Sequence, residues 1–228
     1  MIGIIGAMEI ETAFVGGVYA QYKIAEMTFN LCKISNTDVV VAKCGPGKVN
    51  AALCTQILIN EFKVDSVINM GVAGALNNEL NIGDIFIAEN SIQTDIDTSA
   101  VGDPLGLVSG INVVNFKTDL NIMANLVQAA CRLKKSYMVG NISTNDKFIA
   151  SEQDKKSLYG LFNCDACDME AGAVGHTCYM YDIPYGVIRC ISDKADNSAQ
   201  MDYPEFLKMA CATSKEVLRE YVKIIEKN

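Results

Sequence analysis

Short, almost unbroken apolar runs alternate with amphipathic segments along this chain, and this alternation limits its fold more than any other feature. Residues 1–6 and 184–191 are such runs, and acidic residues follow each of them closely. Strands of this kind are buried on both faces, because helices cover both sides of a largely parallel sheet. The pattern therefore predicts an α/β fold in which helices flank a central, mostly parallel mixed sheet.

The same apolar periodicity predicts the remaining elements. We expect further strands at residues 27–34, 38–44, 65–69, 85–88 and 136–143. We expect helices at residues 48–62, 118–133, 151–159, 170–181 and 204–226, and a helix or helical loop at residues 7–20 that two glycines interrupt.

Three segments carry more specific expectations. In the helix at residues 48–62, the predicted apolar face consists of Val49, Leu53, Ile57 and Leu58. Residues 70–75 contain two glycines and are expected to form a loop. Residues 89–115 have only a weak pattern, and a loop this long inside a compact domain is usually functional or interfacial.

Length and composition favour one folded unit. The chain has 228 residues, half of them hydrophobic, which excludes a disordered protein and suits one large domain spanning residues 1–228. The net charge of −8 argues against nucleic acid or an anionic membrane surface as a partner. The apolar runs are also shorter than the roughly 18 residues that a membrane span requires.

Histidine and cysteine usage narrows the chemistry further. His176 is the single histidine, so a multi-histidine metal site is excluded, and its place inside a helix favours a structural role. The nine cysteines follow no secretory signal, which favours buried thiols in the reducing cytoplasm. Cys164 and Cys167 form a CxxC motif that could serve redox or zinc chemistry, but two buried thiols at a strand end are the favoured interpretation.

Three carboxylates follow the predicted strands at positions where α/β sheets bind ligands. Glu11, Glu170 and Asp193 each lie at or just beyond a predicted strand end, and such ends meet at one edge of the sheet. Carboxylates placed together suit acid–base catalysis, ribose binding or a divalent cation, although each alone could simply begin a helix. The glycines Gly71 and Gly74 match neither a dinucleotide fingerprint nor a P-loop.

Six motifs together resemble one family across essentially the whole chain. They are GIIGAMEIE at 3–11, GPGKVNAA at 45–52, NMGVAGAL at 69–76, DKFIAS at 146–151, DMEAGAV at 168–174 and RCISDKAD at 189–196. In this order they resemble the 5′-methylthioadenosine/S-adenosylhomocysteine nucleosidases of the nucleoside phosphorylase superfamily.

The resemblance implies hydrolysis of the N-glycosidic bond to adenine, with a role in methionine salvage, and it implies neither a cofactor nor a metal. It also implies a homodimer in which the partner closes part of the 5′-alkylthio pocket. Asp193 would protonate the adenine ring nitrogen N7, and Glu11 would deprotonate the attacking water. An apolar setting would raise the pKa of Asp193 and keep it protonated near neutral pH.

The resemblance further implies a set of substrate-binding residues. Glu170 would bind the ribose hydroxyls above Met169, while Phe148 would stack on adenine and the Ile149 backbone would bond its edge. Arg189 would orient Glu170 or the water. The remaining members of the set are Met8, Gly74, Ser192 and Tyr203.

Several positions depart from the family's usual residues and leave alternatives open. Val72 stands where a serine is common and cannot hydrogen-bond water or phosphate. Thr94, Val101 and Tyr203 also depart, in segments expected to shape the 5′ pocket. The alternatives are a phosphate-dependent purine nucleoside phosphorylase, a nucleosidase with altered 5′ specificity or a futalosine-type substrate, and a nucleoside-binding protein without activity.

Overall fold

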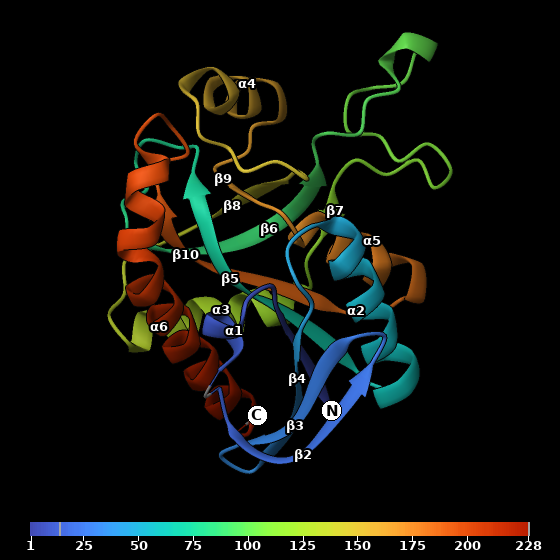
Figure 1. Cartoon of the computed structure of the whole chain (residues 1–228), viewed down its shortest axis with the longest axis vertical. Helices are drawn as coiled ribbons and strands as arrows, with labels where there is room; N and C mark the ends of the chain where they lie inside the picture. Colours follow the sequence, from blue (N-terminus) through green and yellow to red (C-terminus); the bar gives the residue numbers. More distant parts are fainter. Residues whose placement is uncertain (14, 228) are drawn as a thin grey trace.

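Parallel strand pairing organises the centre of this protein, whose computed structural model describes residues 1–13 and 15–227 (Figure 1). The strands of the described chain are β1 (Ile2–Gly6), β2 (Gly17–Ile24), β3 (Met27–Ile34), β4 (Thr37–Lys43), β5 (Ser66–Ala75), β6 (Ile85–Gln93), β7 (Phe116–Lys117), β8 (Tyr137–Thr144), β9 (Ala166–Asp168) and β10 (Tyr185–Asp193). The helices are α1 (Glu9–Thr12), α2 (Lys48–Phe62), the short 3₁₀ turn η1 (Ser99–Val101), α3 (Leu120–Arg132), α4 (Glu152–Phe162), α5 (Ala171–Tyr181) and α6 (Ala199–Ile225).

The sheet is mixed and partly closed. Its central neighbours β4, β1, β5 and β10 run parallel, while β2, β3 and β4 form an antiparallel meander. Strand β10 pairs with both β5 and β6, and β9 joins β8 to β5, so that β5, β10, β6, β8 and β9 close into a ring. The predicted α/β fold with helices flanking a mixed sheet is confirmed.

Each face of the sheet has its own apolar core, because successive side chains of a strand point to opposite faces. Ile5 and Val187 pack with residues of α2 and α5, whereas their neighbours Ile4 and Ile188 pack with residues of α3 and α6. Figure 1 shows α6 along one side of the sheet and α2 beside α5 on the other. These two layers leave the ends of the strands free to carry the site.

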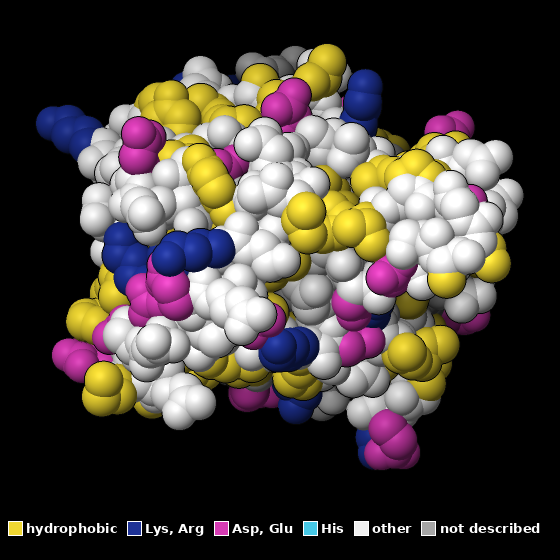
Figure 2. All heavy atoms as spheres, turned by 90° about the horizontal axis from the view of Figure 1, so that it is seen from above, with side chains coloured by type: hydrophobic (Ala, Val, Ile, Leu, Met, Phe, Trp, Pro, Cys, Tyr) yellow, Lys and Arg dark blue, Asp and Glu magenta, His cyan; other side chains and the backbone are white. Residues whose placement is uncertain are grey.

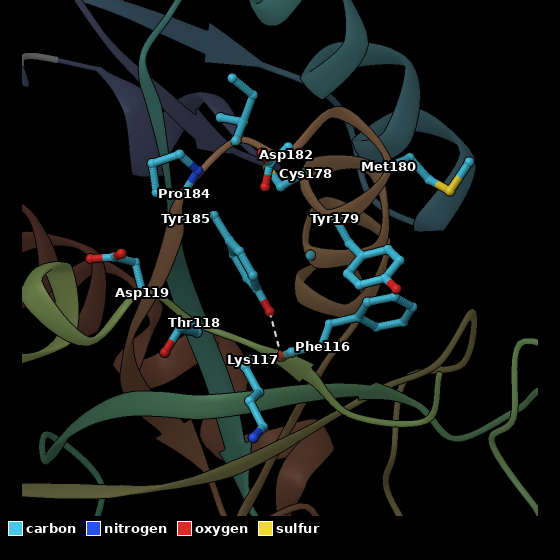
Figure 3. Close-up of a pocket in the computed structure, with 12 residues that line it drawn as sticks. Phe116, Lys117, Thr118, Asp119, Cys178, Tyr179, Met180, Asp182, Pro184 and Tyr185 are labelled. Atoms are coloured by element: carbon cyan, nitrogen blue, oxygen red, sulfur yellow. Dashed lines mark hydrogen bonds between the residues drawn. The ribbon is translucent and has the colours of Figure 1, made fainter. Parts of the chain in front are cut away.

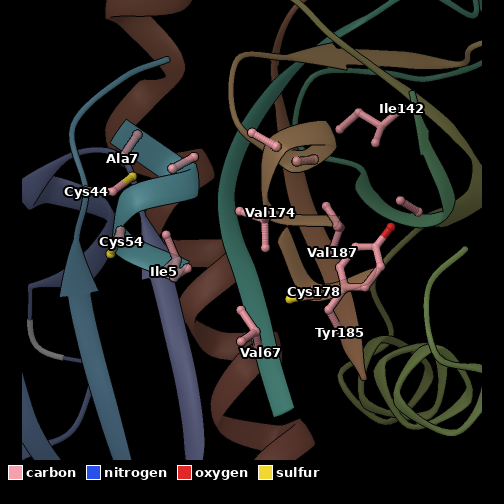
Figure 4. Packing of buried hydrophobic residues seen from close by; sticks show 14 of the residues in the cluster. Ile5, Ala7, Cys44, Cys54, Val67, Ile142, Val174, Cys178, Tyr185 and Val187 are labelled. Atoms are coloured by element: carbon pink, nitrogen blue, oxygen red, sulfur yellow. The ribbon is translucent and has the colours of Figure 1, made fainter. Parts of the chain in front are cut away.

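The thiols are packing residues, as expected. Eight of the nine cysteines are buried, all nine are unpaired, and Cys131 is the exposed one. Figure 4 shows Cys44, Cys54 and Cys178 among the aliphatic side chains of one core. Both cysteines of the CxxC motif are buried without a disulfide, which confirms the favoured interpretation.

The segment at residues 7–20, expected to be a helix or helical loop interrupted by two glycines, is mostly not helical among its described residues. Of the residues described there, the four of α1 are helical, and β2 begins at Gly17 as the edge partner of β3. Residue 14, within that segment, lies outside the described residues. The side chains of β2 are mostly exposed, so the strand is held by its backbone pairing with β3 rather than by an apolar face that the sequence would reveal.

The expected loop at residues 70–75 is instead the end of β5, and β6 likewise continues to Gln93. Helix α6 begins at Ala199, five residues before the predicted start. The prediction placed Pro204 in the first turn, where proline is favoured, whereas it lies in the second turn. No helix among the described residues is both long enough and apolar enough to cross a bilayer.

The predicted apolar face of α2 is also wrong in part. Leu58 is buried as expected, but Val49 and Leu53 are exposed, and the buried face is completed by Ala51, Cys54, Thr55 and Ile59. Apolar residues occur all around this helix, so their spacing does not single out one face.

The fold predicts unequal costs for two leucines of α3. Leu126 is fully buried against α6, whereas Leu120 is 70% exposed. We expect Leu126→Ala to lower the free energy of unfolding by about 2–5 kcal/mol, because it leaves a cavity in the core. Leu120→Ala, the matched control, is expected to change it by less than about 0.5 kcal/mol. Urea unfolding of both variants measures the difference, and equal losses would contradict this packing.

Candidate active site

The predicted carboxylates converge at the ends of the parallel strands β1, β5 and β10. Asp193 is the last residue of β10 and pairs with Gly74 of β5, while Glu11 lies in α1 directly after β1. Glu170 follows β9 and precedes α5. All three side chains are buried, so their convergence reflects the sheet and not a solvated surface cluster.

A cavity with two chambers opens between these elements. The first chamber holds Glu11 and is lined by Ala7, Met8, Pro46, Val72, Ala73, Glu170, Ser192 and Tyr203. The second chamber holds Asp193 and is lined by Lys147 and Ile149. Both share one wall, formed by Gly74, Phe148, Cys167, Asp168 and Met169. Glu11 and Glu170 therefore lie in the first chamber and Asp193 in the second, with Asp168 in the wall between them.

Backbone donors hold Glu11 in the first chamber. The Met8 N–H donates to Oε2 at 2.8 Å, and the Val72 N–H donates to Oε1 at 3.3 Å. Burial raises the pKa of Glu11 above its ordinary value, while Arg189 and these donors oppose the rise. Val72 thus contributes its backbone, although its side chain cannot form a hydrogen bond.

A buried ion-pair network lies behind the first chamber. Arg189 donates to Asp168 at 2.5 Å and to the Asn69 amide oxygen at 2.5 Å, and it lies 3.9 Å from Glu170. Glu170 also accepts from the Gly47 N–H at 3.0 Å. Burial raises the pKa of Glu170 to about 8, and the neighbouring Asp168 adds to the rise.

Asp193 is oriented by its own turn. Its Oδ1 accepts from the Ala195 N–H at 2.9 Å, and its Oδ2 accepts from the Ser192 hydroxyl at 2.9 Å. Burial raises the pKa of Asp193, as expected from the sequence, whereas the two donors oppose the rise. Asp193 is therefore suited to hold a proton at higher pH than an exposed aspartate.

Glycines in β5 make room for both acids. A Cβ at Gly71 would lie 2.5 Å from Glu11 Oε1, and a Cβ at Gly74 would lie 2.8 Å from Asp193 Oδ1. Their α-carbons are separated by roughly 10 Å along the strand, at about 3.3 Å per residue. The two glycines thus allow one strand to pass close to both carboxylates.

Aromatic and thioether side chains supply the apolar walls. The rings of Phe148 and Tyr203 meet edge to face with centroids 5.4 Å apart, and the Tyr203 hydroxyl lies 3.2 Å from the Met8 sulfur. Phe148 is half-exposed and lines both chambers of the cavity. Met169 contributes to the wall that both chambers share.

The structure brings most, but not all, of the predicted residues to the cavity. Ten line it: Met8, Glu11, Gly74, Phe148, Ile149, Met169, Glu170, Ser192, Asp193 and Tyr203. Arg189 does not line it, because the guanidinium lies behind Asp168 and Glu170 and is fully buried. Arg189 could act on a ligand through those carboxylates, which agrees with the expected orientation of Glu170.

Two residues expected to shape the 5′ pocket lie elsewhere. Thr94 is buried in a polar cluster and hydrogen-bonds Ser143 and Asn145, at 2.6 and 2.9 Å. Val101 is exposed on η1, in the arm that projects from the body in Figure 1. Within this chain, neither side chain contributes to the lining of either chamber.

Sequence reasoning missed three contributors to the site. Asp168 anchors Arg189, Gly47 binds Glu170, and Cys167 lies in the wall between the chambers. Gly47 has φ +97°, a conformation that favours glycine, and its motif GPGK was a signal without an assigned role. Cys167 gave no separate signal, because its CxxC spacing pointed to redox or zinc chemistry.

A second hollow lies at the opposite end of β10 and differs in character (Figure 3). Its lining includes Phe116, Asp119, Tyr179 and Tyr185, and the Tyr185 hydroxyl donates to the Phe116 carbonyl at 2.6 Å. None of the three converging carboxylates lines this hollow.

Figure 2 shows the molecule from above, where acidic and basic side chains are interspersed with apolar ones.

Metal binding receives no support from side-chain geometry. Within residues 1–13 and 15–227, no group of three or more His, Cys, Asp or Glu side chains is placed to hold a metal ion. The cavity offers Glu11 and Asp193 in separate chambers, each with a pKa raised by burial, and Glu170 in the same chamber as Glu11.

The raised pKa of Glu170 predicts a specific pH dependence of stability. The folded state releases this proton near pH 8, whereas an unfolded glutamate releases it near 4.5. Its favourable contribution is therefore complete below pH 4.5 and is lost as pH rises through 8. We expect Glu170→Gln to lose less unfolding free energy than the native chain between pH 5 and 8.5, by at least about 1 kcal/mol. Urea unfolding at a series of pH values measures this free energy for both proteins. The same change with pH in both would contradict the prediction.

Comparisons with known proteins agree with this geometry. The family model described as the phosphorylase superfamily matches residues 1–223. A 5′-methylthioadenosine/S-adenosylhomocysteine nucleosidase of Staphylococcus aureus is 35% identical over 97% of this chain and 99% of its own. Among solved structures, a Helicobacter pylori nucleosidase of the same name is 32% identical, with a TM-score of 0.94 and 97% of each chain covered.

A futalosine hydrolase of Helicobacter pylori is as similar in structure, with a TM-score of 0.94, 31% identity and 97% of each chain covered. These relatives share the nucleoside-hydrolysing fold across the full length of the match. The chain therefore belongs to the 5′-methylthioadenosine/S-adenosylhomocysteine nucleosidase family of the phosphorylase superfamily, and it is a hydrolase of N-glycosyl compounds.

Proposed function

We propose that this enzyme hydrolyses 5′-methylthioadenosine and S-adenosylhomocysteine to adenine and the corresponding thioribose. The observation that carries the proposal is the two-chamber cavity with a buried acid in each chamber, Glu11 in one and Asp193 in the other. A nucleoside bound across the shared wall would place its base beside Asp193 and its sugar beside Glu11. The substrate names come from the relatives.

Asp193 acts on the leaving group. The bond between the sugar C1′ and the adenine N9 breaks with its electron pair moving into the base, which is a poor leaving group as an anion. Asp193 donates a proton to N7 as this bond breaks, so that neutral adenine departs. The raised pKa of Asp193 supports this role, because the acid must carry its proton near neutral pH.

Glu11 and Glu170 act on the sugar side. The sugar becomes oxocarbenium-like as the bond breaks, and nearby carboxylates stabilise the developing positive charge. A water attacks C1′ and transfers its proton to Glu11, whose two oxygens are held by backbone donors. Glu170 binds the ribose hydroxyls, and Arg189 and Gly47 keep its carboxyl group in place.

The residues of the shared wall and their neighbours contact the rest of the nucleoside. Phe148 stacks on adenine, and the backbone of Ile149 bonds the edge of the base. Met169 lies under the sugar, and Gly74 lets the strand approach the ligand closely. Met8, Ser192 and Tyr203 complete the lining.

Two alternatives differ in substrate. The futalosine hydrolase of Helicobacter pylori is equally similar in structure, which makes a futalosine-type nucleoside the main competitor. A phosphate-dependent phosphorylase is less well supported, because Glu11 lies in the chamber where phosphate would have to bind and Val72 offers no hydroxyl there. Loss of activity with retained nucleoside binding would be a third outcome.

An exposed apolar surface supports the homodimer that the resemblance implies. Helices α2 and α5 pack side by side, and they expose Val49, Leu53, Met180 and Tyr181 next to the projecting arm with Val101. A contiguous apolar surface of this kind is typical of an interface. A second copy bound here would bring its arm toward the cavity, where it could close the 5′ pocket.

The cellular setting follows from the same chemistry. Nine unpaired thiols, eight of them buried, suit a reducing compartment such as the cytoplasm. Hydrolysis of methylthioadenosine there would place the enzyme in methionine salvage.

The assignment of the two acids predicts large losses of activity. We expect Asp193→Asn and Glu11→Gln each to lower kcat by about 10²–10⁴-fold, because each removes one proton-transfer group. The assay measures free base from methylthioadenosine, S-adenosylhomocysteine, adenosine, inosine and futalosine, with and without phosphate.

Matched controls separate chemistry from folding. Glu9→Gln changes an exposed acid in the same helix as Glu11, and Asp38→Asn changes an exposed aspartate; both are expected to keep the native rate. Native turnover by a folded Asp193→Asn or Glu11→Gln would refute the assignment. Strict phosphate dependence would favour the phosphorylase, and preferential cleavage of futalosine would favour that substrate.

The interface predicts a change in mass. We expect the native chain to have about twice its 24.7 kDa mass in light scattering, and Val49→Asp with Leu53→Asp to reduce it to one chain. Two buried charges without partners would oppose association. Leu161→Asp, at an exposed leucine of α4, is the control and should leave the dimer intact. An unchanged mass in the double variant would place the interface elsewhere.

A further inference from the structure

The turn that orients Asp193 is held by a lysine from a different helix. Lys155, on α4, is only 5% exposed, although most of that helix faces solvent. Its ammonium donates to the Lys194 carbonyl at 2.8 Å and lies 3.9 Å from an Asp196 carboxylate oxygen. Lysine is almost never this deeply buried without a partner, and the proposed reaction steps give this cation no role.

One peptide group connects Lys155 to Asp193. The carbonyl that accepts from Lys155 belongs to Lys194, and the N–H of the same peptide belongs to Ala195. That N–H donates to Asp193 Oδ1 at 2.9 Å. Because the peptide is planar and trans, its carbonyl and its N–H point to opposite sides. The lysine, the peptide and the aspartate therefore form a chain of two hydrogen bonds, and such bonds polarise one another.

The turn needs this support because its backbone is strained. Ala195 has φ +52°, in the left-handed region, which is unfavourable for a residue with a Cβ. Leu158, three residues after Lys155, packs in the same apolar cluster as Ala195. The ammonium of Lys194 donates to the Leu80 carbonyl on the other side. Helix α4 thus holds the turn by one buried cation and one apolar contact.

We propose that Lys155 is a positioning residue for the hydrolysis, which directs the Ala195 N–H at Asp193 and strengthens that hydrogen bond. The proposal rests on the proposed function, in which Asp193 is the acid. Lys155 itself does not line the cavity and acts only through the peptide.

Loss of Lys155 should change proton transfer from Asp193 in one direction. Donation from Ala195 stabilises the Asp193 carboxylate, so its weakening raises the pKa of Asp193 and makes it a weaker acid. The titratable or charged groups that face Asp193 are Cys167, Asp196, Asp202 and Tyr203, and those that face Lys155 are Lys194 and Asp196. All of them remain in a Lys155 variant, so a change relative to the native enzyme reports on Lys155.

The test compares neighbouring lysines of one helix. Lys155→Met removes the cation and is expected to lower kcat about tenfold, with KM within about twofold, since a weaker and less well-placed acid slows the proton transfer. The alkaline limb of kcat/KM should move to higher pH. Lys155→Arg keeps a cation and should restore most of the rate. Lys156→Met, at an exposed lysine 3.2 Å from Glu152, is the matched control and should behave as native.

A folded Lys155→Met with native kcat and a native alkaline limb would overturn the proposal. A second neutral variant, Lys155→Gln, guards against misfolding; if neither neutral variant folds, Lys155 is a scaffold of α4 and the proposal is also overturned. In either case, if the native enzyme is active and Asp193→Asn is inactive, the proposed function stands and only the role of Lys155 is refuted. If the native chain cleaves no nucleoside, or Asp193→Asn keeps the full rate, the proposed function fails as well.

Discussion

The burial of Arg189 against carboxylates is the interaction on which the site depends. Its guanidinium is fully buried and bonds Asp168 and Asn69, with Glu170 nearby. Burial alone would lower the pKa of Arg189, but Asp168 and Glu170 raise it, so the cation is retained. Removing one partner of such a buried pair typically costs about 3–5 kcal/mol, because the other charge remains unpaired. The network therefore ties β5, β9 and β10 together at the place where Glu170 must be held.

The closed ring of strands explains why that network and the cavity occupy the same end of the sheet. Strand β10 lies between β5 and β6, so Asp193 and Arg189 reach the site from one strand, with Arg189 behind the wall and Asp193 in it. Gly71 and Gly74 let β5 pass both acids closely. The same proximity that creates the chambers raises the pKa values of Glu11, Glu170 and Asp193, since each carboxylate loses water without gaining a full counter-charge.

Much of this could be predicted from local pattern. Carboxylates after strand ends indicated the site, because parallel strands bring their ends to one edge. The set of eleven residues came from the family resemblance, and ten of them line the cavity. Prediction was wrong where local pattern is uninformative. The exposed strand β2 carries no apolar face, and α2 has apolar residues on every side, so neither its buried face nor the exposed Val49 and Leu53 could be recognised.

The sequence by itself determined the α/β class, the acidic residues at the strand ends and the absence of a multi-histidine site. Tertiary structure alone decided which partner each acid has. Arg189 lies behind the cavity, Cys167 lies in its wall, and Lys155 reaches the Asp193 turn from α4. The physical reason is distance along the chain: Lys155 and Lys194 are 39 positions apart. No local periodicity or propensity reports such a contact, which exists only once the sheet has closed and α4 has docked.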